Sequence, residues 1–182
     1  MVLISLAITA CGTTSGIKQN DESMAGIDFS GYSAVLVSDF GDETKKKNLP
    51  EYAGSNFADR IVSAIRGTVA FEEVTKDPQE ISDNAILISG DITRYAEGNP
   101  ALKAIVGFGA GSTYFDSDVS LSDYASKNVL GEISVDKNSW ALGGGIAAGQ
   151  SVDQFMNEAA QKIAQELVKA KNVTNEDEAV TQ

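Results

Sequence analysis

The sequence predicts a single α+β domain, in which two main helices pack on one face of a mostly antiparallel sheet. Apolar runs of strand length alternate with segments whose apolar residues recur every three or four positions. These elements follow in the order strand, helix, strand, strand, hairpin, helix, which is typical of a sheet with helices on one side. The chain of 182 residues suits one hydrophobic core rather than two. We predict that the domain covers residues 28–172.

The first half of the domain contains a strand, a helix and two further strands. Residues 34–37 are an apolar run of strand length. Pro50 is typical of a first helical turn and Gly67 of a helix end, and apolar residues recur at helical spacing between them. Residues 71–74 and 85–92 then predict two strands.

The second half predicts a hairpin and a long helix. Residues 114–121 and 129–135 alternate apolar and polar side chains around a turn at residues 127–128. Ser151 and Gln154 have the spacing of a capping box, in which each side chain bonds the backbone N–H of the other residue. A helix with one apolar stripe follows them, so the chain ends its domain on a packed helix.

The N-terminus predicts a lipoprotein signal peptide. Residues 1–10 are uncharged and mostly apolar, and they precede Cys11, the sole cysteine. The run is too short for a membrane-spanning helix, which needs about 20 residues, but it fits the apolar part of a secretory signal. Residues 8–11 (Ile-Thr-Ala-Cys) resemble the bacterial lipoprotein signal, which implies that acyl chains such as palmitate anchor the protein through Cys11. In this pattern Gly12 implies the outer membrane, facing the periplasm; the alternative is an ordinary buried cysteine.

Two polar segments flank the predicted domain. Residues 11–27 are mostly small and polar, and they predict a flexible tether between membrane and domain. Residues 173–182 predict a disordered acidic tail.

The composition excludes several functional classes. Lys and Arg number 14 against 26 Asp and Glu, and the net charge of −12 makes a nucleic-acid partner unfavourable. Histidine is absent, so catalytic triads and zinc sites that use imidazole are excluded. We therefore predict that the protein is not an enzyme and has no cofactor or metal.

Three local patterns imitate ligand-binding motifs. Residues 39–41 spell the Asp-Phe-Gly triplet of protein kinases, but the other kinase motifs are missing. The glycine-rich residues 107–111 are followed by a strand pattern rather than the helix that a nucleotide-binding loop requires. Asp116 and Asp118 share a strand face near Asp123, which leaves a calcium site as an alternative to a solvated polar face.

Several stretches together resemble a known family over about residues 30–170. They are residues 88–95, 98–99, 107–112, 131–133 and 143–145, with Trp140 and the terminal helix. This combination resembles the 4410 family of bacterial envelope lipoproteins, which is catalogued as a domain of unknown function. The resemblance implies a secreted, lipid-anchored domain and adds no catalytic residues.

Two apolar, uncharged glycine-rich segments form a candidate interaction surface. Glycine inside an element costs about 0.5–1 kcal/mol relative to alanine, so clusters of glycine usually meet a structural need. One alternative is that both segments are loops packed on the domain's own sheet; the other is that they contact a subunit, a partner or the membrane. The candidate residues are Gly107, Gly109, Gly111, Trp140, Gly145 and Gly149.

The function expected from these patterns is that of a lipid-anchored, non-enzymatic envelope protein. Its role would be a protein-interaction or structural module facing the periplasm. The alternative is an oligomeric subunit of an export or pore-like envelope assembly, so a homo-oligomer is one expected partner arrangement.

Overall fold

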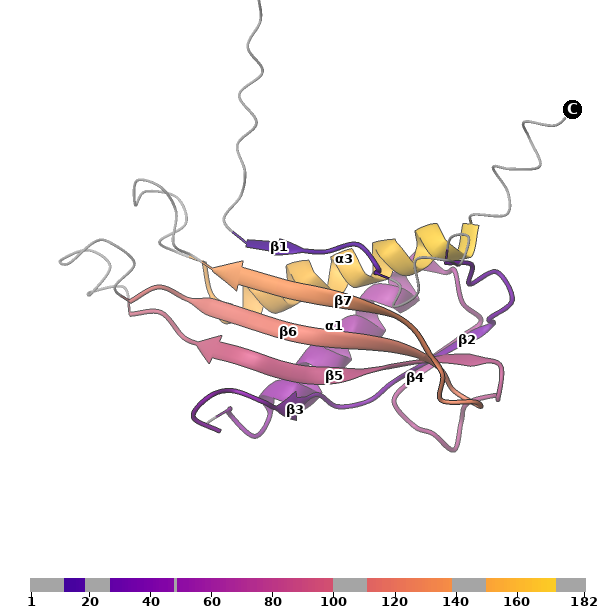
Figure 1. Ribbon diagram of the computed structural model, residues 1–182, viewed down its shortest axis with the longest axis horizontal. Helices are drawn as coiled ribbons and strands as arrows, with labels where there is room; N and C mark the ends of the chain where they lie inside the picture. Colours follow the sequence, from indigo (N-terminus) through magenta and orange to yellow (C-terminus); the bar gives the residue numbers. More distant parts are fainter. Residues whose placement is uncertain (1–11, 19–26, 48, 100–110, 139–149, 173–182) are drawn as a thin grey trace, which may run out of the picture.

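The computed structural model describes residues 12–18, 27–47, 49–99, 111–138 and 150–172 (Figure 1). Within these residues the predicted strands and helices all form. The predicted capping box is confirmed by two hydrogen bonds. Ser151 N–H donates to Gln154 Oε1 at 3.0 Å, and Gln154 N–H donates to Ser151 Oγ at 3.2 Å. The elements in chain order are β1 (Gly12–Thr14), β2 (Ala34–Val37), β3 (Gly41–Asp42), α1 (Ala53–Thr68), β4 (Glu73–Thr75), β5 (Ala85–Ala96), β6 (Tyr114–Asp123), β7 (Val129–Asn138) and α3 (Val152–Asn172).

In the described part of the chain the strands form one seven-stranded sheet in the order β1-β7-β6-β5-β2-β4, with β3 also paired to β5. The long strands β5, β6 and β7 pair antiparallel, as predicted. Strand β2 lies parallel to both β5 and β4, and β3 lies parallel to β5, so the sheet as a whole is mixed. The parallel pair of β2 and β4 follows from α1, which crosses over between them.

Both helices lie on the same side of the sheet, behind the strands in Figure 1. Alternate residues of β6 are buried beneath them, among them Phe115, Val119 and Leu121. Phe57 of α1 packs edge-on between Phe40 and Phe115, with both ring-centroid distances 4.8 Å. The core therefore forms between the helix layer and one face of the sheet, and no helix of the described residues covers the other face.

The predicted tether is wrong for residues 12–18. Strand β1 pairs antiparallel with the outer edge of β7, and Ser15 N–H donates to Ser134 O at 2.9 Å. Lys18 and Glu132 exchange two backbone hydrogen bonds of 2.8 Å. The β-branched pair Thr13 and Thr14 favours an extended backbone, and an unpaired edge of β7 offers it partners. Residues 1–11, 19–26 and 173–182, which include the predicted signal and tail, lie outside the described residues.

Candidate functional site

One end of the sheet gathers the residues next to the predicted lipid-attachment residue and next to both glycine-rich segments, and we call it the Gly12 end. Strand β1 begins there, β5 and β7 end there, and β6 begins there (Figure 1, left). A single row of cross-strand partners joins Gly12 to Lys137, Lys137 to Phe115 and Phe115 to Tyr95. Cys11 directly precedes Gly12, so the predicted lipid-attachment residue adjoins this end.

The flanks of both glycine-rich segments also lie at the Gly12 end. Asn99 N–H donates to Gly111 O at 2.9 Å, which brings together the two sides of the first segment. Thr113 Oγ1 donates to Gln150 O at 2.9 Å, which holds the residue after the second segment against the start of β6. Gly111 has a φ of 72°, in the left-handed region that favours glycine. The other candidates, Cys11, Gly107, Gly109, Trp140, Gly145 and Gly149, lie outside the described residues.

A hollow of about 1050 Å³ opens at the Gly12 end, and we call it the sheet-end pocket. Its charged lining comes from three parts of the chain: the turn after β3, the end of β5 and the start of β6. No local sequence pattern connects the two lysines to the other two parts. Its charged lining residues are Lys45, Lys46, Arg94, Glu97 and Asp116.

The turn that carries the two lysines is held by Asp42. The Asp42 carboxylate accepts hydrogen bonds from Thr44 Oγ1 at 2.6 Å, Thr44 N–H at 2.8 Å and Leu49 N–H at 3.1 Å. The hydrogen bond from the Thr44 hydroxyl is the main reason that the pKa of Asp42 is lowered. Asp42 is itself paired with Ile92 of β5, so this turn is fixed beside β5.

Arg94 and Asp116 form the wall of the sheet-end pocket on β5 and β6. The Arg94 guanidinium carbon lies 3.3 Å from the centre of the Tyr114 ring, a cation–π arrangement. Arg94 Nη1 lies 4.0 Å from Asp116 Oδ2, with the two side chains 52% and 23% exposed. Asp116 Oδ1 is buried and has no hydrogen-bond partner within the described residues. Burial is the main cause that raises the pKa of Asp116 to about 6.

The sheet face without helices is acidic. Asp91 lies directly opposite Asp118, and Asp116 lies directly opposite Asp136. Like charges at opposed positions destabilise a sheet.

Asp123 is at the far end of β6, roughly 24 Å from Asp116 at about 3.4 Å per residue. The three carboxylates considered for calcium therefore do not converge, and the described residues contain no group of three or more His, Cys, Asp or Glu placed to hold a metal ion.

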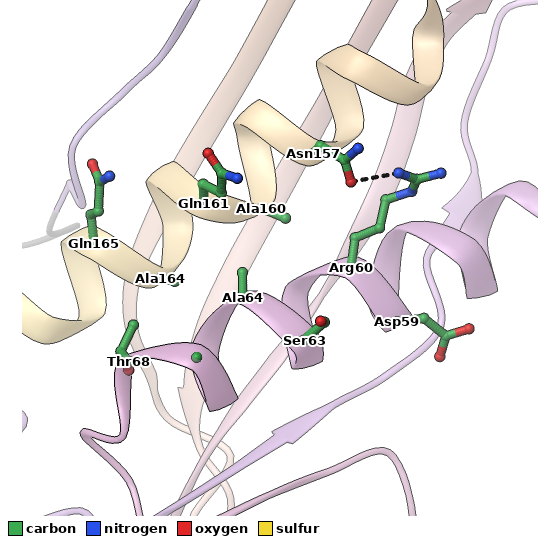
Figure 2. Close-up of a pocket in the computed structure, with 11 residues that line it drawn as sticks. Asp59, Arg60, Ser63, Ala64, Thr68, Asn157, Ala160, Gln161, Ala164 and Gln165 are labelled. Carbon is green, nitrogen blue, oxygen red and sulfur yellow. Dashed lines mark hydrogen bonds between the residues drawn. The ribbon is translucent and has the colours of Figure 1, made fainter.

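A second hollow, of about 610 Å³, follows the outer groove between α1 and α3 (Figure 2). Arg60 closes one end of it by donating to Asn157 Oδ1 at 2.5 Å and to Asp153 Oδ1 at 2.7 Å. Arg60 Nε also donates to Asn56 Oδ1 at 2.8 Å, which keeps the guanidinium in place. The groove floor is made of small residues, such as Ala64 and Ala160, that let the helices approach closely. This groove serves helix packing.

The helices of the described part of the chain are too short or too polar to cross a membrane. The described elements form an α+β domain with two helices on one face of a mixed sheet and a pocket of mixed charge at one end of the sheet. The chain belongs to the family described as "Domain of unknown function (DUF4410)", which matches residues 17–143. This match confirms the predicted domain-of-unknown-function family.

Comparison with solved structures supports the fold. PelC from Paraburkholderia phytofirmans, described as a dodecamer in space groups C2 and P6, is 13% identical with a TM-score of 0.59. The match covers 86% of this chain and 96% of PelC. Protein XCC0632 from Xanthomonas campestris, of family DUF330, is 15% identical with a TM-score of 0.47, covering 84% of this chain and 90% of that protein. The search of curated proteins found no match.

Proposed function

We propose that this protein is a non-enzymatic structural or protein-interaction module of the bacterial envelope, held on the outer membrane by lipid on Cys11 and facing the periplasm. The observation that carries this proposal is the place of Gly12. It is the first residue of an edge strand that is hydrogen-bonded to β7. A lipid on the preceding residue would therefore hold the folded domain directly at the membrane, without a long linker.

The chemistry of the chain supports a role without catalysis. The sequence has no histidine, the usual general base. Asp116, the carboxylate whose pKa is raised to about 6, faces Arg94 and Asp136 rather than a hydroxyl that it would activate. A raised pKa at this position follows from burial and neighbouring charge alone.

A second candidate function is that of a homo-oligomeric subunit in an export or pore-like assembly. The observation that favours it is the fold shared with PelC, which is described as a dodecamer and is covered over 96% of its length. At 13% identity this likeness concerns the fold, so the subunit number is open to measurement. A monomer in detergent favours the first function, whereas a ring or multimer favours the second.

Metabolic labelling with a fatty-acid analogue tests the anchor. The full chain expressed in a Gram-negative host should take up label, and Cys11→Ser should not. A matched control, Cys11→Ser combined with Ser15→Cys, keeps one cysteine but moves it away from the signal, and it should also stay unlabelled. Equal labelling of wild type and Cys11→Ser would contradict lipid attachment. Light scattering of the labelled protein in detergent then measures its oligomeric state.

A further inference from the structure

We infer that the sheet-end pocket is a second membrane contact, in which Lys45, Lys46 and Arg94 bind the phosphate groups of anionic phospholipids. This inference rests on the proposed anchoring at Cys11. The anchor would determine which end of the domain meets the membrane, and the pocket would determine how the domain is oriented there.

The charge of the pocket differs from the charge of the whole protein. The net charge is −12, yet the described lining of the pocket has three cations against two carboxylates, Glu97 and Asp116. Glu97 Oε1 already accepts a hydrogen bond from the Tyr95 hydroxyl at 3.0 Å. Asp116 lies beside Arg94 and is the carboxylate with the raised pKa. The described lining of the pocket therefore has one more positive than negative charge, on a chain whose net charge is −12.

The two lysines are available to a ligand. Both are exposed, and within the described residues neither ammonium group has an ion-pair partner. The neighbouring Lys47 differs, because its Nζ lies 2.7 Å from Glu43 Oε2. An ammonium group without a protein partner is free to bind phosphate oxygens as a point charge.

The position of the pocket points to a membrane rather than to a soluble anion. Tyr95, which lines it, is three strands from Gly12 in the same cross-strand row, roughly 14 Å at about 4.8 Å per strand. Acyl chains on Cys11 would hold Gly12 at the bilayer surface, so the pocket would lie within reach of lipid headgroups. Each Lys or Arg near an anionic surface strengthens binding about fivefold.

Aromatic side chains beside the pocket fit the same surface. Tyr114 carries Arg94 on its ring, and Tyr52 is 61% exposed. Tyrosine is enriched where proteins meet the membrane–water interface, because it combines an apolar ring with a polar tip. The acidic face of the sheet, with Asp91 and Asp118, would be repelled by the same lipids. The two effects together select one orientation.

Vesicle sedimentation tests the pocket separately from the anchor, because it uses full-length Cys11→Ser protein, which carries no lipid. This protein should bind vesicles of phosphatidylcholine with about 30% phosphatidylglycerol, in line with a contribution of about fivefold per cation, and should bind pure phosphatidylcholine far less. Adding Lys45→Ala and Lys46→Ala should weaken binding at least tenfold. The control pair Lys127→Ala and Lys169→Ala makes the same charge change at the opposite end of the sheet and α3, and should leave binding nearly unchanged.

Three results would overturn the inference: no preference for anionic vesicles, an equal loss in both double variants, or saturable binding of inorganic phosphate that the Lys45 and Lys46 changes abolish. The last result would assign the pocket to a free anion. Thermal melts of the variants, expected to match the parent, show that the exposed lysines do not act through folding. Failure of fatty-acid labelling would contradict the anchor without changing these measurements, so the two proposals fail separately.

Discussion

Asp116 on β6 lies directly opposite Asp136 on β7, on the sheet face turned away from both helices. Opposed carboxylates repel each other, and burial of Asp116 adds to the cost of its charge. Arg94 and the backbone N–H of Lys137 act in the other direction, while Asp118 on the same strand adds a weaker repulsion. The result is a raised pKa, about 6 against an ordinary 3.8.

This relationship predicts a pH-dependent stability. The folded state holds the Asp116 proton more tightly than the unfolded chain does, so its stability should rise as pH falls from above 6 toward 4. Asp116→Asn should remove this dependence and be about 1–2 kcal/mol more stable than wild type at pH 7.5, allowing for solvent screening. Urea unfolding of both proteins at pH 5 and pH 7.5 measures the difference. Equal pH dependence in the two proteins would contradict the assignment, and the exposed neighbour Asp118→Asn serves as control.

The two glycines of α1 predict opposite effects of alanine. A Cβ on Gly54 would lie 2.0 Å from Phe40 O, so Gly54→Ala should cost about 2–3 kcal/mol through forced movement of the backbone. A Cβ on Gly67 would meet nothing within 4 Å, so Gly67→Ala should stabilise the helix by about 0.5–1 kcal/mol. Chemical denaturation measures both. If both substitutions change the free energy of unfolding in the same direction, this would contradict the close packing of Gly54 against Phe40.

The place of β1 in the sheet predicts a strong effect of proline at Ser15. Ser15→Pro removes the N–H that donates to Ser134 O, and it should cost about 1–3 kcal/mol. Ser15→Ala keeps that bond and loses the two made by the hydroxyl, from Ser134 N–H to Ser15 Oγ and from Ser15 Oγ to Gly16 O. Both are exposed, so Ser15→Ala should cost about 1 kcal/mol or less. Hydrogen exchange should also show faster exchange along β7 in the proline variant alone. If both variants behave like wild type, residues 12–18 act as the tether that the sequence predicted.

The capping box of α3 predicts a graded response at Ser151. Ser151→Ala leaves Gln154 N–H without its acceptor, which should cost about 1 kcal/mol. Ser151→Asp supplies another good cap and should recover most of that loss. Thermal unfolding should show that stability decreases from wild type to Ser151→Asp to Ser151→Ala. An alanine variant as stable as wild type would mean that the cap does not contribute.

Much of the fold could be predicted from local sequence patterns. Alternation over residues 114–121 and 129–135 identified β6 and β7, and helical spacing identified α1 and α3. The two-residue strand β3 is too short to produce a period. The small polar residues of β1 are equally typical of linkers, so the sequence predicts a tether there. Pairing with β7, and not its own composition, makes it a strand.

The site was less predictable because its residues are distant in sequence. Alternation over residues 114–121 places Asp116 on a polar strand face, and Lys45–Lys47 is a basic run in a chain of net charge −12. Nothing local relates these lysines to Arg94, more than 40 positions later. Their meeting depends on the parallel pairing of β3 with β5.

The sequence by itself determined the family, the acidic charge, the absence of imidazole chemistry and the main helices and strands, because these depend on composition and on the spacing of nearby residues. Only the tertiary structure decided that Gly12 begins an edge strand, that Lys45 and Lys46 line one pocket with Arg94, and that Asp116 faces Asp136. Strand order and register arise from backbone hydrogen bonds between distant segments, and every residue offers the same backbone groups for them. Side-chain periodicity shows which face of a strand is buried, but it does not show which strand will lie beside it.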